Sequence, residues 1–181
     1  MKTKKETFRK IIVFFTTLYS FIYCTVFADE VKIKITGEIY APPCKINNDL
    51  PFDISFGNIS LREIDGNNFK QTKTVSVECT NTSGNPYISI VSNTGIIGEN
   101  ILDTNGANKT SLGIALYQGD SIDNNYPLKI NTDKDMIRKG LSPTGASVSS
   151  FTFTAVPYRN GGTTLIAGTF NATITMNIFY M

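Results

Sequence analysis

The feature that most constrains this chain is the alternation of apolar and polar residues near its C-terminus. From Phe170 to Tyr180 every second residue is apolar, while the residues between them are Thr or Asn except for Phe179. A period of two is typical of a β-strand with one buried face, and the stretch contains no Pro and many β-branched and aromatic residues. We therefore expect a strand over residues 168–181. Its core-facing side chains are Phe170, Ala172, Ile174, Met176, Ile178 and Tyr180.

The outer edge of this strand is expected to be open, because we expect no later segment to pair with it. A long apolar strand with an unpaired edge tends to associate with another chain unless something covers it. The residues alone leave two interpretations open. The strand is paired on both sides inside its own sandwich, or it offers its edge to a strand from another protein.

A second alternating segment lies near the N-terminus, where apolar positions interleave with Lys, Thr and Glu. Gly37 falls in phase with the apolar positions, and a glycine weakens a free strand, so we expect a packing reason for it. Pro42 and Pro43 follow, and prolines cannot donate to a ladder. The alternative is that this segment folds back onto its own domain, which would leave the two prolines unexplained. The apolar phase consists of Val31, Ile33, Ile35, Gly37 and Ile39.

Between these segments the chain contains short β-type runs separated by Gly-, Asn- and Pro-rich turns. About seven short strands with almost no helical periodicity predict an all-β sandwich of immunoglobulin-like type. Residues 57–68, 93–111 and 131–150 are expected to be loops, with residues 134–139 forming either one helical turn or a solvated loop. The expected strands are 45–46, 50–56, 71–79, 87–92, 112–118, 127–130 and 149–157, ahead of the C-terminal one.

Residues 1–28 are predicted to be a secretory signal peptide. Five of the 17 basic residues lie within the first ten positions, residues 11–27 are uncharged and apolar, and Ala28 supplies a small residue at the cleavage point. A retained membrane anchor is the alternative, although the run is slightly short for a span. Without the leader the chain carries a formal charge near −2 and no basic cluster. This excludes nucleic acid and anionic membranes as expected partners.

Cys44 and Cys79 remain after cleavage, whereas Cys24 leaves with the leader. In an exported chain an even pair of cysteines predicts a disulfide, with free thiols as the alternative. A metal site would need more ligands, and the sequence contains no histidine. On the chain-entropy model the closed loop should stabilise the domain by roughly 4 kcal/mol.

An enzymatic function is disfavoured, because without histidine the usual nucleophile–base pairs are missing. An exported hydrolase is therefore a remote alternative, and we expect no catalytic residue, cofactor, metal or small-molecule substrate. Carboxylate pairs at 120/123 and 133/135 lie in turns without the spacing of an EF-hand and are expected to be solvated. Glycosylation sequons begin at Asn58, Asn81, Asn108 and Asn171.

The two alternating ends together carry a resemblance to a known family. Gly168, the alternating run behind it and the penultimate aromatic Tyr180 resemble the C-terminal signature of chaperone–usher fimbrial (pilus) subunits. The N-terminal alternating segment with Gly37, followed by Pro-Pro-Cys, resembles that family's donor strand. Addition of such a strand to a sheet edge is a known mode of recognition between pilins and chaperones. The size and short arm resemble a type 1/P-like minor (adaptor) pilin.

The resemblance implies an incomplete immunoglobulin-like sandwich that lacks its last strand and is completed by donor-strand complementation. Residues 29–43 would be an N-terminal donor-strand extension and residues 44–181 the pilin domain. The donor residues would be Val31, Ile33, Ile35, Gly37 and Ile39. The acceptor strand, which also binds the chaperone, would present Gly168, Phe170, Ala172, Ile174, Met176, Ile178 and Tyr180.

The partners implied are a periplasmic pilus chaperone, an outer-membrane usher and neighbouring pilus subunits. The protein would pass through the periplasm of a Gram-negative bacterium to a fimbrium on the cell surface, and would serve in adhesion as a structural subunit near the tip. Two alternatives remain. One is a major shaft pilin, and the other is a self-contained secreted β-sandwich that binds a glycan or receptor through residues such as Tyr117, Tyr126 and Tyr158.

Overall fold

The computed structural model describes residues 31–40 and 42–181. Residues Ile39–Met181 form one unit, and the described residues before them, 31–38, belong to another. The predicted signal peptide, residues 1–28, lies outside the described residues. In the part of the chain that the structure describes, no helix is long and apolar enough to cross a membrane.

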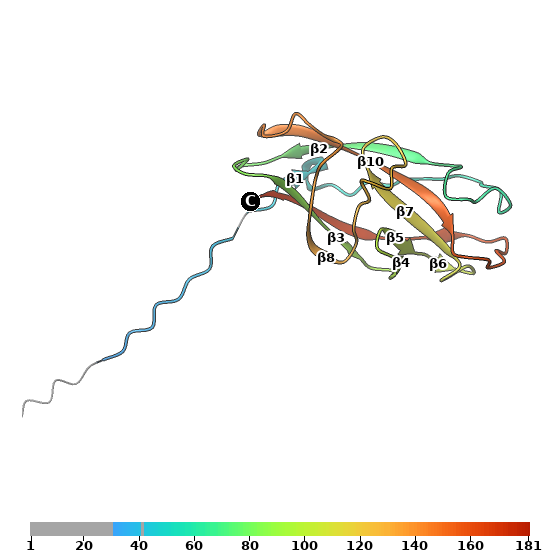
Figure 1. The fold of residues 1–181 in the computed structure, drawn as a ribbon, viewed down its shortest axis with the longest axis horizontal. Helices are drawn as coiled ribbons and strands as arrows, with labels where there is room; N and C mark the ends of the chain where they lie inside the picture. The colour runs from blue at the N-terminus through green and yellow to red at the C-terminus, as the bar shows by residue number, and fades with distance from the viewer. Residues whose placement is uncertain (1–30, 41) are drawn as a thin grey trace, which may run out of the picture. The chain divides into compact units, whose positions relative to one another are not determined.

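The larger sheet contains seven antiparallel strands and forms one layer of the sandwich (Figure 1). Its longest strand, β10, lies between β2 and β7, and β9 also pairs with β10. The order along the sheet is β1 (Lys45–Ile46), β2 (Gln71–Glu78), β10 (Val148–Arg159), β7 (Leu112–Gln118), β5 (Ile101–Asp103) and β4 (Ile96–Gly98), with β9 at Leu141–Ser142.

The smaller sheet has the order β12 (Ile174–Tyr180), β3 (Pro86–Ser92) and β8 (Thr132–Met136), so β12 is an edge strand. Figure 1 shows β3 and the C-terminal strand running side by side. A two-stranded ladder joins β11 (Phe170–Asn171) to β6 (Asn105–Gly106). The described residues contain no α-helix, only one turn of 3-10 helix at Asn47–Asp49. The all-β, immunoglobulin-like fold predicted from the sequence is confirmed.

The core lies between the two sheets and is built from the in-facing half of each alternating strand. Phe151 and Phe153 of β10 stack with their ring centroids 6.0 Å apart. Ile88 and Ile90 of β3 face them from the smaller sheet as members of the same buried cluster. The predicted disulfide is present, and it joins Cys44 to Cys79 with a Cα–Cα distance of 4.3 Å.

Several expected elements differ from the structure. Residues 50–56 form no strand, and of residues 127–130 only Pro127 makes an isolated bridge, to Tyr117. The expected loops 93–111 and 131–150 contain short strands, and β8 replaces the helical turn or loop expected at residues 134–139. The C-terminal strand is interrupted between Asn171 and Ile174. Alternation reports which side chains face the core, but it does not report whether a neighbouring strand is present to complete a ladder.

Candidate functional site

The inner face of the C-terminal strand becomes less buried from one end to the other. Ile178 and Tyr180 are 0 % and 3 % exposed and belong to the core. The four alternating residues before them are only half-buried, although they pack against the same core cluster. These four are Phe170, Ala172, Ile174 and Met176. The sequence predicted the correct face for all six residues, but it did not predict this gradient.

The backbone of β12 is hydrogen-bonded to β3 on one edge. Met181 and Asn85 exchange both bonds, at 2.8 and 3.1 Å, and the N–H of Asn93 donates to the carbonyl oxygen of Thr173. Because bonded and non-bonded pairs alternate along an antiparallel ladder, the N–H and C=O groups of Ile174 and Met176 point away from β3. No strand among residues 31–40 and 42–181 pairs with β12 on that side.

One backbone bond does reach this second edge. The N–H of Cys44 donates to the carbonyl oxygen of Ile178 at 2.6 Å. The edge is therefore occupied at Ile178, whereas no backbone bond from the described residues occupies it at Ile174 or Met176. The open stretch of backbone coincides with the half-buried stretch of side chains.

A second set of half-buried apolar side chains comes from residues 50–57. Phe52, Ile54 and Phe56 alternate with exposed residues and pack against the main core, but they belong to no ladder. The ring of Phe52 lies 6.3 Å from that of Phe153, and the ring of Phe56 lies 6.1 Å from that of Phe170, both measured between centroids. Like the open edge of β12, this extended segment has half-buried apolar side chains, and no strand among the described residues is paired with its backbone.

These two sets define a surface that we call the acceptor face. It combines incompletely buried apolar side chains with unpaired backbone groups, which is the combination that an added β-strand can satisfy. The contribution of Phe52, Ile54 and Phe56 to this surface was not predicted from the sequence, although their period-two pattern is visible in the predicted strand 50–56. The acceptor face consists of Phe52, Ile54, Phe56, Phe170, Ala172, Ile174 and Met176.

The remaining predicted acceptor residues have other surroundings. A Cβ added to Gly168 would meet the Cβ of Ala107 at 3.5 Å, an ordinary contact, so nothing around it requires a glycine. The hydroxyl of Tyr180 accepts a hydrogen bond from the N–H of Gly145 at 3.0 Å. Tyr180 is thus part of the buried core, and neither residue is counted in the acceptor face.

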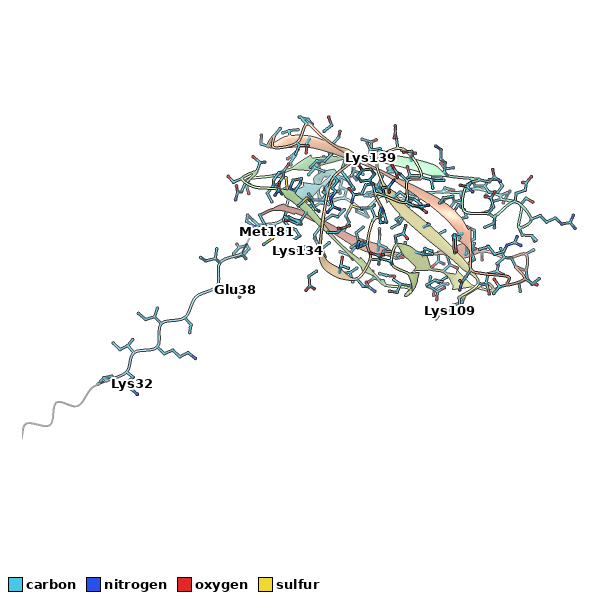
Figure 2. The ribbon with its side chains drawn as sticks, viewed as in Figure 1. Lys32, Glu38, Lys109, Lys134, Lys139 and Met181 are labelled. Carbon is cyan, nitrogen blue, oxygen red and sulfur yellow. A yellow bond between two sulfur atoms is a disulfide. The ribbon has the colours of Figure 1, made fainter. Side chains whose placement is uncertain are left out.

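The predicted donor residues are exposed. Val31, Ile33, Ile35 and Ile39 are all exposed, and residues 31–40 contain no ladder. Figure 2 shows the side chains of this segment on alternate sides of an extended backbone that includes Lys32 and Glu38. Nothing lies within 4 Å of a Cβ built on Gly37. Four exposed aliphatic side chains in one phase are the kind of surface that a protein partner covers.

Other candidate sites have structural roles. The backbone N–H of Asn125 is the main cause that lowers the pKa of Asp123, and Lys139 adds to the effect. Among the described residues no group of three His, Cys, Asp or Glu side chains could hold a metal ion. The side-chain amide of Asn108 is buried and bonds both to the carbonyl oxygen and to the N–H of Ile166, so this sequon is inaccessible in the folded chain.

The three tyrosines considered as glycan contacts are largely packing residues. Tyr117 is buried, and Tyr158 packs against the same small apolar cluster on the larger sheet. Tyr126 is partly covered by Lys139, whose ammonium group lies 5.6 Å from the ring centroid. The residues named for a self-contained binder therefore provide no exposed aromatic platform.

Comparisons with known proteins agree with this geometry. Residues 33–181 match the family model described as fimbrial protein. The chain is 37 % identical over 152 residues to the minor fimbrial protein PrsF of Escherichia coli, covering 83 % of this chain and 88 % of the relative. It is 38 % identical over 152 residues to the fimbrial adapter PapF of Escherichia coli, with the same coverage. The solved structure of the P pilus adaptor subunit PapF matches with a TM-score of 0.53 and 34 % identity, covering 80 % of this chain and 100 % of that one.

Proposed function

Because the chain belongs to the fimbrial protein family, we propose that its acceptor face is completed by a β-strand from another protein and that its own residues 29–43 complete a neighbour. The chain is a structural subunit of a fimbrium, of the minor, adaptor type of its relatives, and it is not an enzyme. Like other fimbrial subunits, it is exported through the periplasm to the pilus on the cell surface.

The proposal rests on one observation: the backbone groups that lack a partner and the apolar side chains that lack full cover belong to the same residues of β12. Ile174 and Met176 present free backbone groups at the edge of β12, and their side chains are only half-buried. An incoming strand with alternating apolar residues would supply the backbone partners and the missing cover together. Val31, Ile33 and Ile35 of this chain have that pattern. Burying each would contribute roughly 1.5–3 kcal/mol before ordering costs.

In the proposed assembly, two proteins donate a strand to the acceptor face, one after the other. A periplasmic chaperone first lends a strand to the acceptor face and keeps the subunit from aggregating. At an outer-membrane usher, the N-terminal arm of the next subunit then replaces the chaperone strand. Exchange needs no ATP if the second strand packs better than the first, because the difference in packing free energy drives it. The arm of this chain acts in the same way on its own neighbour.

Two adjacent residues of β12 provide a matched test of this proposal. Ile174 belongs to the acceptor face, whereas Thr175 points to the exposed side of the same strand. We expect Ile174→Asp to abolish co-purification with periplasmic partners and incorporation into fibres, because an aspartate in the acceptor face would be buried unpaired by the incoming strand. Thr175→Asp should retain both. Mass spectrometry of the co-purified proteins identifies the partners, and disulfide formation in each variant checks folding.

The proposal would be wrong if Ile174→Asp were captured and incorporated like the parent chain. It would also be wrong if the mature chain purified alone as a stable monomer that bound no strand. That second result would favour the self-contained secreted sandwich.

A further inference from the structure

We propose that Cys44 is a fixed end stop that sets the register of the incoming strand on β12. The inference rests on the function proposed above, because it concerns how a strand would sit on the acceptor face. An end stop is needed for a physical reason. Alternation excludes a slip of one residue, since that would turn every side chain to the wrong face, but a slip of two residues keeps all side chains on the correct face.

Cys44 lies at the position that an incoming strand would reach if it slipped two residues further toward the C-terminal end of β12. The carbonyl oxygen of Ile178 points to the open edge and would be the next acceptor for a strand already paired with Met176. It already accepts the N–H of Cys44 at 2.6 Å. An incoming strand therefore finds free backbone groups at Ile174 and Met176 but meets the chain itself at Ile178.

Cys44 is held in place from three sides. The disulfide ties it to Cys79 with a Cα–Cα distance of 4.3 Å. Lys45 and Ile46 pair with Glu78 and Val77 immediately after it. The N–H of Cys79 donates to the carbonyl oxygen of Ser147 at 2.8 Å, which anchors the far side of the disulfide. Displacing Cys44 from Ile178 would require movement of this whole corner of the sandwich.

Cys44 blocks one position rather than extending a strand along the edge. Pro43 and Pro42 precede it, and neither has an N–H to donate to β12. The blocked position also matches the side chains, because Ile178 is fully buried whereas Met176 is half-buried. The backbone stop and the end of the open apolar surface therefore fall between the same two residues.

The stop limits the length of strand that can be accommodated. At about 3.3 Å per residue, the stretch from Phe170 to Met176 spans roughly 20 Å and offers four in-phase positions. The arm of this chain has five in-phase positions, from Val31 to Ile39. A donor arm with five in-phase positions is therefore one position longer than the four that the acceptor face offers. Because Cys44 blocks the Ile178 end, the extra position must lie beyond the Phe170 end.

Single-residue amide exchange on the mature chain tests this directly, with a synthetic peptide of residues 29–40 as the probe strand. We expect the peptide to slow exchange at Ile174 and Met176 by at least tenfold while the amide of Cys44 stays as protected as before. Faster exchange at Cys44 on peptide binding would overturn the end stop, because the peptide would then have taken its place on Ile178. No change at Ile174 and Met176 would instead overturn the proposed function, and this inference with it.

A second measurement examines the register itself. The peptide carries a photoreactive residue in place of Ile35, and the cross-linked position on the chain is mapped by mass spectrometry. We expect one principal cross-link in the parent chain and two, separated by two residues of β12, in the variant Cys44→Ser with Cys79→Ser. Cross-links spread over two registers in the parent chain would refute the end stop, even if the double variant failed to fold.

Discussion

Truncation of Ile174 should cost more stability when a donor strand is bound than when it is absent. Ile174 and Ile178 have the same side chain on the same face of β12, but Ile178 is fully buried and Ile174 is half-buried. Truncating a buried Ile to Ala costs about 2–5 kcal/mol. We expect Ile178→Ala to show this cost with or without a strand. Ile174→Ala should cost about 1–2 kcal/mol in the open chain, because part of the side chain is already in water.

Binding of a donor strand changes the surroundings of Ile174 but not those of Ile178. It covers the exposed part of Ile174, so the truncation then also leaves a cavity, and its cost should rise by about 1–2 kcal/mol. The assay is urea unfolding of each variant with and without a copy of residues 29–40 appended after Met181. An equal cost of Ile174→Ala in both backgrounds would refute the reasoning, as would a strand-dependent cost of Ile178→Ala.

Three further predictions concern the arm, the disulfide and acid stability. Gly37→Leu should block incorporation into fibres but leave chaperone capture intact, because only the arm is changed; normal fibres from this variant would contradict the donor assignment. Replacing Cys44 and Cys79 with Ser should lower the free energy of unfolding by about 4 kcal/mol, since the disulfide closes a loop with a sequence separation of 35; a urea midpoint equal to the parent's would contradict this. The backbone N–H groups of Asn68 and Asn67 lower the pKa of Asp65 in the folded chain, so its contribution is present above the unfolded pKa and is lost as pH falls through the folded pKa. Urea unfolding between pH 2 and 7 should therefore show a weaker loss of stability in acid for Asp65→Asn than for the parent chain, and parallel curves would count against it.

The strands that the sequence predicted well are those with a partner strand on both sides. β2, β3, β7 and β10 each lie within two residues of their expected bounds. All four contribute apolar side chains to the core: β2, β3 and β10 do so through alternating residues, whereas every residue of β7 is buried. β8 was missed, since its residues Asp133 and Lys134 are exposed and an edge strand can be polar along most of its length.

The acceptor face could be predicted only in part. The alternation of residues 170–180 indicated which side chains face inward, and all six are buried or half-buried. It could not show that burial is complete at Ile178 and incomplete at Met176, because that difference depends on which segments of the folded chain lie against each residue; the N–H of Cys44, for example, meets β12 at Ile178. Likewise, residues 50–56 were expected as a strand, but only the fold shows that they lack a ladder partner.

The most direct test of the central claim is the stability of the mature chain with and without the appended strand, residues 29–40, compared by urea unfolding. The account predicts a stabilisation of several kcal/mol, because burial of each aliphatic donor residue contributes roughly 1.5–3 kcal/mol before ordering costs. A matched appended strand with Val31, Ile33 and Ile35 replaced by Ser should give almost none of it. Equal stability of the open chain and both appended chains would contradict the claim that this domain lacks a strand.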